Sequence, residues 1–242
     1  MPHGQPDFGA YAAKATVGSL ADMAELAARL GSIVTYDRRG DVVFLDSFES
    51  GLSAFYTDAS GAGGSVTQSP EQARNGMFSA KMVCGSNLLR EAYLWKYLPY
   101  PILGNLGVEF SFTMAAEIEQ LDFIIETIDA DKTLWAQLRF DQDADILKYR
   151  HGDTGLKTLQ AALSLLEFDY MFHTLKVVID YKKGKYVRAL LDEKSWDMSD
   201  YPIWTLGAGV GNRLYFALNA TGEAAANATI YIDDVIVTQN EP

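Results

Sequence analysis

The chain has 242 residues, of which 48% are hydrophobic and 12% aromatic, so it can bury a sizeable core and is not a disordered polymer. Its net charge of −12 repels phosphate backbones and argues against a nucleic-acid partner. Cys84 is the only cysteine, which excludes an intrachain disulfide, and no apolar run reaches the roughly 18–20 residues of a membrane span.

The first 31 residues predict an extended arm and one short helix. Residues 1–18 contain Gly, Pro and Ala without periodicity and lack the basic and apolar regions of a signal peptide. We therefore expect synthesis in the cytoplasm. Ser19 and Asp22 form a capping-box pattern, and Gly31 provides a helix stop. A helix of about 11 residues is marginal alone, so it must pack on its own domain or on a neighbouring subunit.

From Ser32 onward the hydrophobic period changes to two, which predicts strands. Residues 33–36 and 41–45 flank the turn 37–40 as a hairpin. Stretch 154–168 has helical propensity, but its context favours strands. The other predicted strands, which turn residues separate, are 77–84, 88–98, 107–117, 121–128, 133–140, 145–150, 172–181, 185–192, 204–210, 213–219 and 228–238. This pattern predicts an all-β, antiparallel sandwich over residues 32–242 behind the N-terminal arm.

Four segments resemble the jelly roll of concanavalin A-like, or laminin G-like, domains and many carbohydrate-binding modules. They are LDSFESG at 45–51, NGMFSAKM at 75–82, HTLKVVID at 173–180 with GKY at 184–186, and YIDDVIV at 231–237. Together they extend over residues 41–238. The resemblance implies an antiparallel jelly-roll β-sandwich. It leaves the function open, because this fold hosts lectins, hydrolases, adhesins and virion proteins.

A structural calcium ion is a further implication of this resemblance. The first and last strands of a jelly roll commonly lie close together, which would bring Asp46 or Glu49 near Asp233 or Asp234. Calcium prefers roughly six to eight hard oxygen ligands, such as carboxylates. In the alternative, these acidic residues cap turns and stay solvated. No motif requires any other cofactor.

No recognisable catalytic motif occurs, so we expect a non-enzymatic protein. Retaining glycoside hydrolases of this fold place their carboxylates on one strand face, and Glu119 and Asp122 would face opposite sides of a strand. The histidines are far apart and no zinc-binding, nucleophile-elbow or phosphate-loop pattern is present. The nearest candidate carboxylates are Glu117, Glu119, Asp122 and Glu126, and the histidines are His3, His151 and His173.

Sugar binding would need an aromatic platform. Tyr93, Trp95 and Tyr97 share one face of a strand, a pattern more typical of a core or an interface. Aromatic residues in and beside the loop-like segment 197–202 are better ligand candidates, because loops carry function. The predicted ligand-binding residues are Trp196, Tyr201 and Trp204.

Residues 24–49 resemble, in style, virion proteins of tailed phages that display a jelly roll on a capsid or tail. The resulting hypothesis is a structural or decoration protein of a virion or similar extracellular assembly. Residues 1–40 would anchor it to copies of itself or to capsid or tail neighbours. The first alternative is a carbohydrate-binding module or adhesin with a glycan partner. The second is a concanavalin A-like glycoside hydrolase.

Overall fold

The computed structural model describes residues 40–87, 90–99, 104–129, 131–224 and 227–242. The chain divides into two units, Met1–Arg38 and Arg39–Pro242, and all of the described residues belong to the second. The predicted arm, the predicted helix and the strand at 33–36 lie outside the described residues. So does nearly all of segment 1–40, which was predicted to bind neighbours.

Two antiparallel sheets make up the described domain. Sheet A has the strand order β13-β12-β11-β6-β16-β4-β3, with β1 also paired to β16. Its strands are β1 (Asp41–Asp46), β3 (Ser65–Ser69), β4 (Ser79–Val83), β6 (Asn105–Phe112), β11 (His173–Asp180), β12 (Lys185–Leu191), β13 (Lys194–Asp197) and β16 (Thr229–Glu241).

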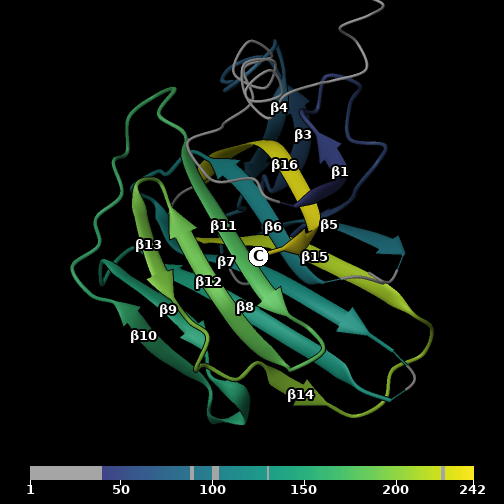
Figure 1. Ribbon diagram of the computed structural model, residues 1–242. Coiled ribbons are helices and arrows are strands. Elements are labelled where there is room, and N and C mark those ends of the chain that lie inside the picture. The colour runs from purple at the N-terminus through teal and green to yellow at the C-terminus, as the bar shows by residue number, and fades with distance from the viewer. Residues whose placement is uncertain (1–39, 88–89, 100–103, 130, 225–226) are drawn as a thin grey trace, which may run out of the picture. The chain divides into compact units, whose positions relative to one another are not determined.

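Sheet B has the order β10-β9-β8-β7-β15-β5-β2, with β14 also paired to β8. Its strands are β2 (Tyr56–Ala59), β5 (Glu91–Pro99), β7 (Ile118–Ile128), β8 (Thr133–Asp141), β9 (Ile146–Arg150), β10 (Leu156–Gln160), β14 (Trp204–Leu206) and β15 (Arg213–Gly222). Figure 1 shows the sheets as two layers, with β11 and β12 of sheet A crossing in front of β7 and β8 of sheet B.

The core lies between the two sheets, where alternate side chains of each strand point inward. Phe110 and Phe112 of β6 meet Phe123 of β7 at ring-centroid distances of 5.8 and 5.2 Å. Phe110 also packs 5.9 Å from Phe216 of β15. These contacts join sheet A to sheet B. Cys84 is fully buried in this core, as expected for an inert thiol.

The all-β sandwich predicted from the sequence is confirmed. In the described part of the chain, the helical content is limited to the 3₁₀ turn η1 (Gly152–Thr154), and no helix there is long and apolar enough to cross a membrane. Stretch 154–168 contains β10 and then irregular backbone from residue 161 onward, so the strand prediction holds only for its first half. Strands β2, β3 and β13 were not predicted, because they are short and largely polar.

Candidate functional site

The outer face of sheet B carries an open groove of about 660 Å³. Side chains from β2, β5, β15, β7 and β8 contribute to it, so the groove crosses five neighbouring strands. The residues that line it are Asp58, Ser60, Glu91, Tyr93, Trp95, Tyr97, Glu126, Trp135 and Tyr215.

The aromatic residues of β5 lie on this outer face because the strand alternates. Ala92 and Leu94 are buried in the core, whereas Tyr93, Trp95 and Tyr97 lie on the opposite side of the strand. The exposed fraction of Tyr97 is 43%. Of the two expectations for these three residues, a core or an interface, the core is therefore wrong, since the residues line the groove on the outer face.

Strand register arranges the outward side chains in rows across the sheet. The row at one end of the groove holds three aromatic residues on β5, β15 and β8, a carboxylate on β7 and a fourth aromatic residue on β14. Across the sheet, from β5 through β15, β7 and β8 to β14, the row is Tyr97, Tyr215, Glu126, Trp135 and Trp204. The next row holds Tyr56, Trp95, Ala217, Ile124 and Gln137, and the third Asp58, Tyr93, Asn219, Asp122 and Arg139.

Ring contacts hold this aromatic surface in place. Tyr56 stacks on Trp95 with ring centroids 5.8 Å apart and an interplanar angle of 18°. Tyr97 packs on Tyr215 at 5.3 Å, and the two tryptophans of the same row lie 6.1 Å apart. Because the rings already contact one another on a rigid sheet, little conformational entropy would be lost in ordering them when a ligand binds.

The groove also contains three carboxylates. Glu91 accepts a hydrogen bond from the Tyr93 hydroxyl at 2.7 Å, and Asp58 accepts one from the backbone N–H of Ala59 at 2.9 Å. Burial raises the pKa of Glu126, and the nearby positive charge of Arg213 acts in the opposite direction. The three carboxylates therefore place acidic groups among the aromatic rings of the groove.

Two of the four carboxylates considered for hydrolysis, Glu119 and Asp122, are engaged in ion pairs. Asp122 accepts hydrogen bonds from Nε and Nη2 of Arg139 at 2.7 and 2.6 Å, and Glu119 is held by Arg90 at 3.0 and 3.2 Å. Asp122 and Glu126 share the outer face of β7 but are four residues apart, which is roughly 13 Å along a strand. That separation exceeds the roughly 5–9.5 Å of glycosidase carboxylate pairs.

The predicted ligand-binding residues are not brought together as one platform. Trp204, on β14, lies beside Trp135 at the end of the groove. Tyr201 stacks on Tyr149 with centroids 4.6 Å apart. Trp196 belongs to β13 of sheet A and packs partly against the core. Of the three predicted residues, Trp204 is the one next to the groove.

The first and last strands lie side by side, as predicted, with Asp46 opposite Val235. Asp46 accepts a hydrogen bond from the backbone N–H of Phe48 at 2.8 Å. Glu49 accepts from the backbone N–H groups of Met77 and Phe78 at 2.8 and 2.9 Å. Both carboxylates therefore act as turn and loop anchors.

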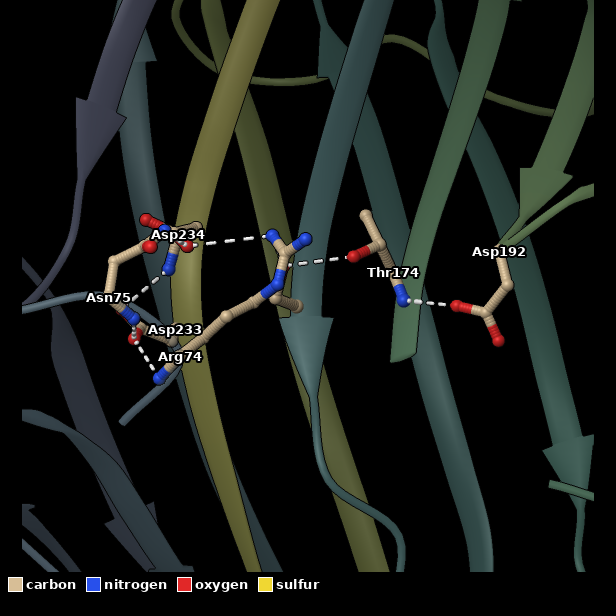
Figure 2. Close-up of polar contacts among 7 residues, drawn as sticks. Arg74, Asn75, Thr174, Asp192, Asp233 and Asp234 are labelled. Carbon is tan, nitrogen blue, oxygen red and sulfur yellow. Dashed lines mark hydrogen bonds and ion pairs between the residues drawn. The ribbon is translucent and has the colours of Figure 1, made fainter. Parts of the chain in front are cut away.

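Asp233 and Asp234, on β16, hold loop 74–78, which Glu49 also contacts. Asp233 Oδ2 accepts from the backbone N–H groups of Arg74 and Asn75 at 2.8 and 3.1 Å, and the Asn75 side chain donates to Asp234 (Figure 2). Within the described ranges, no group of three histidine, cysteine, aspartate or glutamate residues could hold a metal ion. The structural calcium ion stays a prediction.

No protein-family model matches the sequence, and no curated protein matches it either. Among solved structures, the chain is similar to a sialidase (TM-score 0.53, 11% identity), covering 84% of this chain and 19% of the sialidase. It is also similar to the cellulose induced protein Cip1 (TM-score 0.50, 19% identity, 81% and 96% covered). A third match is the Emp46p carbohydrate recognition domain in its metal-free form (TM-score 0.50, 9% identity, 79% and 90% covered).

The chain therefore spans less than a fifth of the sialidase but most of the length of the other two proteins. At these identities the likeness shows the fold alone. The described domain is a concanavalin A-like jelly roll, as the sequence motifs implied.

Proposed function

We propose that this domain binds a polysaccharide along the outer face of sheet B. The observation that carries the proposal is the aromatic groove itself. Trp95, Tyr97, Trp135 and Tyr215 occupy outward positions on β5, β8 and β15, where Tyr97 is exposed and the other three rings are partly exposed. Partly exposed rings gain less from folding than rings buried in the core. Flat rings offer a stacking surface for the apolar faces of pyranose sugars.

The shape of the groove favours a chain-like ligand over a compact one. It is open to solvent and runs across five strands, so that a long molecule could enter and leave without a lid. Polar groups beside the rings, such as the Ser60 and Tyr93 hydroxyls, are suited to hydrogen bonds with sugar hydroxyl groups. The Emp46p domain with a similar fold is itself a carbohydrate recognition domain, which supports the proposal by analogy.

Binding is proposed to occur without hydrolysis. The strand carboxylates Asp122 and Glu119 are held by Arg139 and Arg90, and the spacing of Asp122 and Glu126 along β7 suits neither hydrolytic geometry. We therefore expect the protein to bind a polysaccharide without shortening its chain.

The test is affinity electrophoresis of the full chain through gels that contain neutral, cationic or acidic polysaccharides. We expect retardation by at least one of them, and a roughly tenfold loss of affinity in Trp95→Ala, as expected for the loss of one stacked ring. Phe168→Ala removes an exposed ring outside sheet B and serves as the matched control. The absence of binding to every polysaccharide, or equal binding by wild type and Trp95→Ala, would contradict the proposal.

Display of the domain on a virion or other assembly remains a separate prediction. It depends on residues 1–40, nearly all of which lie outside the described part of the chain, and no described contact supports it. Loss of self-association after deletion of residues 1–31, with the jelly roll still folded, is the expected outcome. A deletion variant that assembles like the full chain would contradict an anchoring role.

A further inference from the structure

The groove on sheet B has an unbalanced charge. Three of the residues that line it are carboxylates, namely Asp58, Glu91 and Glu126, and no lysine, arginine or histidine of the described chain lines it. In the described residues, none of these three carboxylates lies within ion-pair distance of a basic side chain. Asp58 accepts a hydrogen bond from a backbone N–H and Glu91 accepts one from a tyrosine hydroxyl, and both donors are neutral.

The basic residues near the groove do not line it. Arg139 is bound to Asp122 through two of its nitrogens. Arg213 donates from Nη1 to the carbonyl oxygen of Val210 at 2.7 Å and lies over the Tyr97 ring, 5.3 Å from its centroid. Arg213 keeps its positive charge, which acts to lower the pKa of Glu126, and Arg150 lies over the Trp204 ring beside the groove, 3.8 Å from its centroid. The three lining carboxylates outnumber these two arginines, and the net charge of −12 on the whole chain adds to the negative potential of the groove.

Resting on the proposed glycan-binding function, we infer that the groove selects a cationic glycan, a polymer of amino sugars, over neutral and acidic ones. Aromatic rings attract ammonium groups through their π faces, and carboxylates attract them by charge. The groove combines both kinds of group on one surface. Uronic acid and sulfated polymers would meet three like charges there.

The placement of the carboxylates indicates a polymer with repeated charges. Glu126 lies in the same row as Tyr97, whereas Glu91 is six residues before Tyr97 on β5. Along a strand this offset corresponds to roughly 20 Å. One ammonium group cannot reach both carboxylates at that separation, but a chain with an amino group on each sugar can.

The experiment compares three probes by isothermal titration of the full chain. They are a β-1,4-linked glucosamine oligomer, its fully N-acetylated counterpart of equal length, and an oligogalacturonate. At mildly acidic pH the first carries ammonium groups, the second is neutral and the third is anionic. We expect the order of affinity to be glucosamine, then N-acetylglucosamine, then galacturonate.

Charge-neutralising variants show whether the groove carboxylates cause the preference for the glucosamine oligomer. Glu126→Gln and Glu91→Gln should each reduce the preference for the glucosamine oligomer by roughly two- to fivefold, the value of a partly exposed charge pair. Added salt should reduce it too, because it screens exposed charges. Glu193→Gln, in the exposed turn between β12 and β13 of sheet A, removes the same charge outside the groove and should leave the preference intact.

Each outcome decides between the two claims. Equal or tighter binding of the neutral or anionic oligomer overturns the cationic preference, while the proposed glycan binding stands. A preference that survives both glutamine substitutions also overturns it, because the charge would then act elsewhere. If none of the three probes binds and no polysaccharide retards the chain, the proposed function fails as well.

Discussion

His173 and Asp192 form a hydrogen-bonded ion pair at the end of the β11–β12 hairpin. Nδ1 of His173 lies 2.6 Å from Oδ2 of Asp192, and Nε2 lies 3.0 Å from the carbonyl oxygen of Leu166. A carboxylate and a carbonyl oxygen both accept hydrogen bonds, so the doubly protonated, charged form of the imidazole is the one that satisfies both contacts. Asp192 also accepts from the backbone N–H of Thr174, at the right-hand end of the contacts in Figure 2.

This pair predicts a pH dependence of stability. Burial lowers the pKa of His173, but the hydrogen bonds to Asp192 and Leu166 and the charge of Asp192 outweigh burial and raise the pKa. A raised folded-state pKa contributes stability that is fully present below the unfolded value of about 6.5 and is lost as pH rises through the folded value. The urea midpoint of wild type should therefore fall over that window, and that of His173→Gln should fall less. Parallel pH profiles of the two proteins would contradict this account.

Asp233→Asn should destabilise the domain. The carboxylate is fully buried and accepts backbone hydrogen bonds from Arg74, Asn75 and Asp234. An amide would place a donor group among these donors, at a cost of roughly 1–3 kcal/mol in the free energy of unfolding. Chemical denaturation measures the change, and Asp143→Asn in an exposed turn is the control. A loss no greater than that of the control would show that Asp233 does not hold loop 74–78.

Calcium binding at the junction of β1 and β16 is tested by metal removal. If Asp46, Glu49, Asp233 or Asp234 hold a calcium ion, a chelator should lower the melting temperature and added calcium should restore it. Glu49→Gln should then reduce the response to calcium. A melting temperature that neither chelator nor calcium changes would leave these carboxylates as loop anchors alone.

The Cys84 thiol should be unreactive in the folded protein. Burial raises its pKa to about 12, and Sγ lies 3.4 Å from the carbonyl oxygen of Ala220. Little thiolate is present at neutral pH, and the thiolate is the reactive form. A thiol-specific reagent should modify Cys84 only in denaturant. Rapid modification of the native protein would contradict the buried position.

The sequence was sufficient to predict the sandwich and most of its strands, because a period of two is a local signal. It also placed the first and last strands together through the motifs at 45–51 and 231–237, and β1 does pair with β16. The sequence did not predict that Glu49 and Asp233 hold loop 74–78, because these hydrogen bonds join segments that are far apart in the chain.

The groove could not be found from sequence for two physical reasons. On β5 both faces are apolar, with Ala92 and Leu94 on one side and the aromatic residues on the other, so the pattern does not say which face is the core. In addition, Tyr97 meets Tyr215 and Glu126 only through the sheet order β5-β15-β7. Trp204 was predicted because of its loop-like neighbourhood, but its position beside Trp135 follows from the β14–β8 pairing.

The most direct test of glycan binding on sheet B is to map the contact surface by NMR. Titration of the isotope-labelled chain with the tightest-binding oligosaccharide should perturb amide signals of β5, β15, β7 and β8, together with the indole signals of Trp95 and Trp135. Perturbations confined to β13 and the following loop, around Trp196 and Tyr201, would contradict the groove as the binding site. An unperturbed spectrum in the presence of every oligosaccharide would contradict glycan binding itself.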